Sequence, residues 1–100
     1  MATTTKALGR GAFAVTSGTL YTVPSATTAV VTNIVITNTA GSAGTFTLAL
    51  NGTSLATTVA VAANSITTLD IKQVLSATQT ITGLASATTI NYHISGVEIA

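Results

Sequence analysis

Residues 45–55 of the sequence read TFTLALNGTSL, and this stretch decides the fold class. Phenylalanine and leucine alternate with threonine and alanine up to residue 50, which is the pattern of a strand with one buried face. Asn51-Gly52 follows directly, and both central positions of a type I′ hairpin turn require the positive φ that these residues tolerate. The pattern therefore predicts a β-hairpin over residues 45–61. Its return strand is expected to turn Leu55, Val59 and Val61 inward.

The segment before this hairpin predicts a short strand followed by a long one. Residues 20–23 form an apolar run that stops at Pro24, because proline cannot donate to a β-ladder. After a turn, residues 28–38 predict a long strand with apolar side chains on both faces. One face carries Val30, Ile34 and Ile36, and the other carries Val31 and Val35. Such a strand is either central and covered by a loop, or its outer face meets another molecule.

The rest of the chain predicts more strands separated by turns. Strands are expected over residues 65–71, over 78–82 and from residue 89 onward, with loops at 39–44 and 83–87. In the last strand a β-bulge at Gly96 is expected to return Val97 and Ile99 to the core face. About seven or eight short strands without any helical period predict an all-β fold, a single antiparallel β-sandwich. Jelly-roll and immunoglobulin-like topologies both remain open.

Residues 1–11 differ from the remainder of the chain. They lack alternation, contain two glycines and hold two of the three basic residues, Lys6 and Arg10. We expect an extended N-terminal arm over residues 1–11 and a β-sandwich domain over residues 12–100. Such an arm is either ordered only against a partner or adds a strand to the edge of the sandwich.

Charge is unusually scarce, and this scarcity excludes several classes of function. Charged residues make up 5% of the chain, whereas a typical soluble domain has about 25%. Cysteine is absent, and the chain contains one histidine, His93. Two basic residues in the arm cannot supply general nucleic-acid affinity at physiological salt, so we expect no nucleic-acid partner. No stretch approaches the roughly 20 apolar residues of a membrane span, so we expect no membrane partner either.

The residues that could carry chemistry are few and scattered. His93 alternates with Asn91 and Ser95 on the polar face of a predicted strand, and no nucleophile-elbow motif is present. Asp70 and Lys72 lie two apart on one predicted strand, so they are expected to pair with each other or across to a neighbouring strand, or else to serve as recognition contacts. We therefore expect no catalytic, cofactor-binding or metal-binding residue, no cofactor and no small-molecule substrate.

The predicted surface is instead small and neutral. Threonine, alanine and serine supply nearly half of the chain. Such side chains lose little entropy when they are immobilised and can pack closely against neighbours. We infer that much of the surface is covered in a permanent and symmetric assembly.

Three segments carry a resemblance to a known group of proteins. They are LYTVP at residues 20–24, TTAVVTNIVITNT at residues 27–39 and HISGVEI at residues 93–99. Together with the Asn-Gly hairpin, these segments resemble small β-sandwich virion proteins of tailed bacteriophages. The likeness spans residues 19–99.

The resemblance implies a structural protein made in the host bacterial cytoplasm and located on the capsid surface of the virion. Its first implied role is capsid decoration, with the major capsid protein as partner and a homotrimer or another symmetric homo-oligomer as the assembly. A tail, collar or fibre component is the alternative, followed by a carbohydrate-binding module and then a hydrolase. The residues expected at the interface are Lys6, Arg10, Val31 and Val35.

Overall fold

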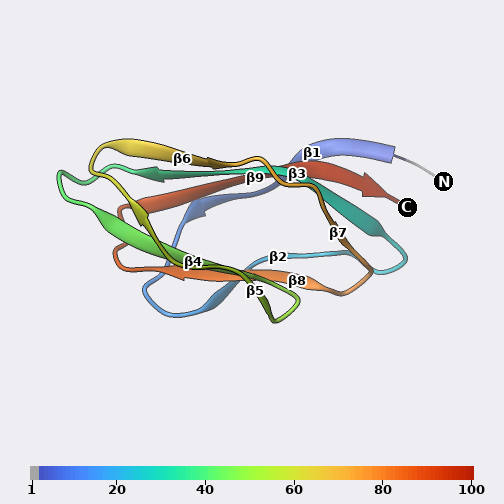
Figure 1. The fold of residues 1–100 in the computed structure, drawn as a ribbon. Helices are drawn as coiled ribbons and strands as arrows, with labels where there is room; N and C mark the ends of the chain where they lie inside the picture. Colours follow the sequence, from blue (N-terminus) through green and yellow to red (C-terminus); the bar gives the residue numbers. More distant parts are fainter. Residues whose placement is uncertain (1–2) are drawn as a thin grey trace.

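The computed structural model describes residues 3–100, which form nine strands in two packed antiparallel sheets (Figure 1). The strands are β1 (Thr3–Ala12), β2 (Gly18–Thr22), β3 (Thr28–Asn38), β4 (Gly44–Leu50), β5 (Thr53–Val61), β6 (Ser65–Leu69), β7 (Gln73–Leu75), β8 (Thr80–Ala85) and β9 (Ile90–Ile99). The predicted all-β sandwich is confirmed.

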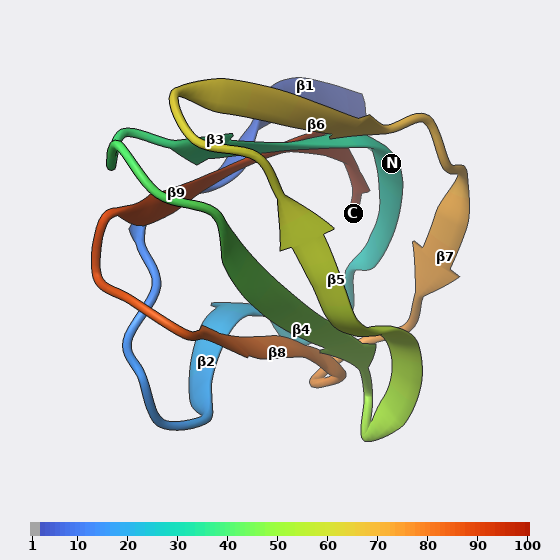
Figure 2. The same cartoon turned by 60° about the vertical axis from the view of Figure 1, so that its left-hand side comes forward.

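The two sheets differ in size and in strand order. The five-stranded sheet has the order β1-β9-β3-β6, and β7 pairs with β3 beyond the end of β6. The four-stranded sheet has the order β2-β8-β4-β5. In the turned view of Figure 2, β7 lies at one side of the sandwich, where the chain passes from the five-stranded sheet towards β8. The two sheets meet along a core that is drawn from every part of the chain.

The hairpin at the centre of the sequence forms as predicted. β4 and β5 pair antiparallel, and Asn51 and Gly52 form the turn between them with φ of 48° and 82°. Both values are positive, as the type I′ turn requires. The predicted long strand is also confirmed, because β3 has the predicted bounds of residues 28–38.

Large apolar side chains from both sheets fill the space between them. The largest that are almost completely buried are Phe13, Phe46, Ile34, Ile36, Leu48, Ile81, Ile90 and Ile94. The Phe13 ring lies 6.4 Å from the Phe46 ring and 5.1 Å from the Tyr92 ring, measured between centroids. Aromatic pairs at these separations stabilise a core beyond the area that they bury.

The bulges of the five-stranded sheet do not lie where the sequence predicted. β9 keeps its alternation, whereas its two neighbours each carry an extra residue, Leu8 in β1 and Thr32 in β3. The predicted bulge at Gly96 is therefore wrong, and Val97 and Ile99 point away from the core. Gly96 itself is buried on the core face. A Cβ there would overlap the Val30 carbonyl oxygen and would lie 2.7 Å from Leu8 Cδ1.

β8 extends further than predicted. Residues 83–85 were expected in a loop, but they continue the strand and pair with β4. Gly83 and Ala85 have low strand propensity, so the sequence predicts a strand only weakly here, yet both residues are buried. A Cβ at Gly83 would lie 2.8 Å from the Thr47 carbonyl oxygen and 2.9 Å from Phe13. Close packing against the neighbouring strand therefore overrides the local turn propensity of the sequence.

The segment predicted as an N-terminal arm is an edge strand of the protein's own sandwich. From Thr3 onward it pairs with β9, which is the second of the two arrangements expected for it. Its glycines, Gly9 and Gly11, lie beside the Tyr92 ring, and a Cβ on them would lie 3.3 Å and 3.5 Å from that side chain. Because Gly9 and Gly11 have no side chains, the Tyr92 ring can pack directly over the backbone of β1.

Gly96→Ala is expected to destabilise the fold by about 1–3 kcal/mol, because the added methyl group meets backbone that cannot move aside. Urea unfolding followed by circular dichroism measures the effect. Gly18→Ala is the matched control, since nothing lies within 4 Å of a Cβ at Gly18. Equal stability of the Gly96→Ala variant and the wild type would contradict the close approach of β3 and β9.

Candidate interaction surface

The acidic side chains and the histidine do not form a metal-ligating group in the part of the chain that the structure describes. Within residues 3–100, no group of three or more His, Cys, Asp and Glu side chains could hold a metal ion. His93 is half-buried on β9. Lys72 and Asp70 form an exposed ion pair of 3.2 Å, which is the local one of the two expected pairings. The predicted strand does not reach them, because both residues lie between β6 and β7. The same residues contain no helix long and apolar enough to cross a membrane.

The outer face of the five-stranded sheet carries a row of aligned valines. Val74 of β7, Val30 of β3 and Val97 of β9 are register partners in turn, and the row ends at Thr5 of β1. Val74 is 66% exposed, whereas Val30 and Val97 are half-buried. Val35 lies on the same side of β3. We call Val30, Val35, Val74 and Val97 the valine face.

The structure corrects one of the predicted interface residues. Val31 was expected on the outer face of β3, but its exposed fraction is 0% and it belongs to the core. The extra residue Thr32 shifts the alternation, so that Val31 and Ile34 both point inward although three positions separate them. The same shift places Val30 outside, where the sequence pattern had placed it inside. Val35 is half-buried on the outer face, as expected.

The two predicted basic interface residues point to opposite faces of the sheet. Arg10 pairs in register with His93 on the outer face and is exposed. Lys6 pairs in register with Gly96 and points inward. The extra residue Leu8 lies between them and reverses the alternation. The structure therefore does not bring Lys6 and Arg10 together, and Arg10 alone accompanies the valine face.

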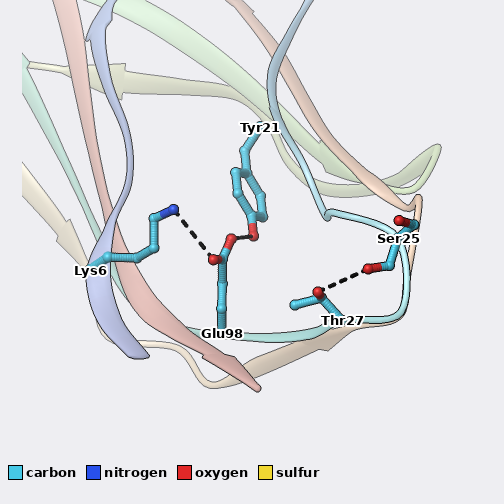
Figure 3. Close-up of polar contacts among 5 residues, drawn as sticks. All are labelled: Lys6, Tyr21, Ser25, Thr27 and Glu98. Atoms are coloured by element: carbon cyan, nitrogen blue, oxygen red, sulfur yellow. Dashed lines mark hydrogen bonds and ion pairs between the residues drawn. The ribbon is translucent and has the colours of Figure 1, made fainter. Parts of the chain in front are cut away.

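Lys6 instead joins a polar cluster between the sheets, which Figure 3 shows. The Tyr21 hydroxyl donates a hydrogen bond to Glu98 Oε2 at 2.5 Å, and Lys6 Nζ donates to Glu98 Oε1 at 3.3 Å. Tyr21 belongs to β2 of the four-stranded sheet, whereas Lys6 and Glu98 belong to β1 and β9. The Glu98 carboxylate thus links the two sheets through hydrogen bonds. In the adjoining turn, Thr27 Oγ1 donates to the Ser25 carbonyl oxygen at 3.1 Å.

The cluster shifts the pKa values of two of its members. The Tyr21 hydrogen bond holds the Glu98 pKa below its ordinary value; burial opposes this effect, and the hydrogen bond and charge of Lys6 add to it. Burial and the neighbouring carboxylate raise the pKa of the Tyr21 hydroxyl. The cluster was not predicted from the sequence, because the bulge expected at Gly96 would turn Glu98 away from the core. Unbroken alternation from Tyr92 would have placed Glu98 on the inner face.

Two grooves at the sandwich surface are lined by neutral side chains. One is lined by Thr37, Asn38, Thr39, Asn64, Ser65 and Ile66, and another by Leu50, Asn51, Thr53, Ser54, Leu55, Gln73, Val74, Leu75 and Gln79. Neither lining set includes a charged or aromatic residue. The Asn38 amide is used by the fold: its Nδ2 donates to the Ser42 carbonyl oxygen at 2.9 Å, and its Oδ1 accepts from the Ala40 N–H at 3.0 Å.

Comparison with known proteins adds little to this description. No family model and no curated protein matches the chain. Among solved structures, the CBM35 domain from Paenibacillus barcinonensis matches with 10% sequence identity and a TM-score of 0.41, over 98% of this chain and 88% of that one. Similarity this low carries no argument about the function of this chain.

The Glu98 cluster makes the stability of the fold depend on pH. Because the Glu98 pKa is lowered on folding, its contribution is complete well above its ordinary value of 4.5 and is lost as the pH falls through and below that value. Because the Tyr21 pKa is raised, stability also falls above its ordinary value of 10.0. Tyr21→Phe is expected to cost about 1 kcal/mol at neutral pH and to weaken both dependences.

Thermal unfolding across the pH range measures these effects. Tyr92→Phe is the matched control and is expected to keep the pH dependence of the wild type. A Tyr21→Phe profile that overlays the wild-type profile would show that the cluster does not stabilise the fold.

Proposed function

We propose that this chain is a structural virion protein of a tailed phage, a capsid decoration protein that binds the assembled shell through its valine face. The observation that carries the proposal is the aligned row of Val74, Val30 and Val97 on the outer face of the five-stranded sheet. A partly exposed apolar row of this kind on a small neutral protein is consistent with a surface that another molecule covers. The resemblance of residues 20–39 to tailed-phage virion proteins supports the same assignment.

The mechanism is burial of apolar area where neighbouring capsid subunits meet. Each Å² of apolar surface removed from water contributes about 25 cal/mol. The partner is the major capsid protein, and the protein acts on the capsid surface after synthesis in the host cytoplasm. Because only the assembled shell offers the junction, binding stabilises the assembled state by mass action. The small outer residues of β1, which are threonines and alanines, allow close approach at little entropic cost.

The distribution of charged residues supports a protein as the partner and not a nucleic acid. Four of the five charged residues are used in two ion pairs, Lys6 with Glu98 and Lys72 with Asp70. Arg10 is the remaining charged residue, and it is exposed on the outer face. A surface with an apolar row and one cation fits a partner with an apolar patch and few carboxylates. It does not fit the regular phosphates of a nucleic acid.

The number of copies per particle tests the proposal. Quantitative mass spectrometry of purified particles is expected to give a ratio to the major capsid protein that is comparable to one or a simple fraction of it. A low ratio matching tail symmetry would instead favour the tail, collar or fibre role. Absence from purified particles would refute a virion role altogether.

The double variant Val30→Asp with Val97→Asp is expected to lose at least tenfold in affinity for shells that lack the protein, because two carboxylates would have to be buried at the interface. Co-sedimentation with such shells measures binding. Val15→Asp is the control, because Val15 is equally apolar and 57% exposed but lies in the loop between β1 and β2. Unchanged binding of the double variant would show that the valine face is not the contact.

A further inference from the structure

β1 leaves one side of its backbone unpaired in the described part of the chain. It is the edge of the five-stranded sheet and pairs with β9 alone. With ten residues it is also the longest of the edge strands. An unpaired edge presents a row of N–H and C=O groups that can pair with another strand, so natural proteins usually guard such edges.

The other edges carry the usual protections. β2 has five residues and an irregularity next to Leu20. β5 has two register shifts and a positive φ of 50° at Thr58. β6 and β7 are short, and the exposed ion pair Lys72–Asp70 lies between them.

The first half of β1 has no such protection. Residues 3–7 run without a register shift, read TTTKA and contain no proline. Lys6 is the residue that would ordinarily guard this edge, but it points inward and pairs with Glu98. Threonine is favoured at strand positions, and Thr–Thr pairs across strands are stabilising.

We propose that the edge of β1 pairs with β1 of a second copy of this chain, antiparallel, about a two-fold axis at Thr5. The sheet then continues through both copies, and the same patch is used on each, as a two-fold interface requires. In this register Thr3 lies opposite Ala7 of the second copy, and Thr4 lies opposite Lys6. The inference goes beyond the proposed function and does not rest on it.

Three constraints select this register. A continuous sheet must keep outer residues opposite outer residues, so the axis passes through a residue and not between two. An axis at Lys6 would place two ammonium groups directly opposite each other, which is destabilising. An axis at Thr4 would use only part of the regular segment. The axis at Thr5 uses all of residues 3–7.

The same register has a consequence for the outer surface. Thr5 ends the row that runs from Val74 through Val30 and Val97. With Thr5 on the axis, this row meets its copy end to end, and the two valine faces become one continuous surface. An assembly of two copies would therefore offer a partner twice the apolar row of one chain, on a single sheet.

Sedimentation equilibrium of the purified protein tests the proposal in solution. The wild type is expected to have twice the mass of the 9.9 kDa chain. Thr5→Lys places two like charges at the axis and is expected to give the single-chain mass. Thr3→Lys is the matched control, because it adds the same charge to the same face of the same strand but opposes Ala7, so it is expected to keep the doubled mass.

Cross-linking gives an independent measurement if Thr5→Lys fails to fold. The chain has no cysteine, so Thr5→Cys introduces a single thiol that is expected to form a disulfide-linked dimer on mild oxidation. Thr4→Cys, one residue away on the opposite face, is expected to cross-link at least tenfold less. A single-chain or trimeric mass for the wild type, or equal cross-linking of the two variants, would overturn the proposal. None of these results depends on whether the protein occurs in virions.

Discussion

The structure depends on one constraint: β9 remains a regular strand while both of its neighbours bulge against it. Leu8 in β1 and Thr32 in β3 are extra residues on either side of the same short section of β9. Thr32 Oγ1 donates to the Ser95 carbonyl oxygen at 3.1 Å, which holds the second bulge in place. Ser95 borders both bulges, and at the adjacent Gly96 the neighbouring backbone leaves no room for a side chain. These contacts determine which residues of three strands face the core.

Two features of the molecule, the Glu98 cluster and the valine face, follow from this arrangement. On the inner side, unbroken alternation in β9 brings Glu98 between the sheets, where Tyr21 and Lys6 bind it. On the outer side, the shifted phase of β3 exposes Val30 beside Val97. A carboxylate placed inside and valines placed outside would each be unfavourable in an isolated sheet. The carboxylate is satisfied by its partners, whereas the valines remain partly exposed.

The sequence predicted those parts of the fold whose signals are local. The Asn51-Gly52 turn and the bounds of β3 follow from turn chemistry and alternation, and both are confirmed. The bulges could not be predicted in the same way, because an extra residue is defined by the strand opposite it and Leu8 and Thr32 are ordinary strand residues. Gly96 lies beside the bulges but belongs to the regular strand β9. The register shift was therefore assigned to β9 and not to β1 and β3. Val31, Val97 and Glu98 were misplaced for this reason alone.

The pairing of Thr3 with Ile99 also determines how the molecule responds to mechanical load. Force applied between these two residues separates β1 from β9 at one end, so the hydrogen bonds of that pair break one after another and not all together. Sequential breakage needs little force. A sandwich of this topology is therefore a weak link when it is pulled through Thr3 and Ile99.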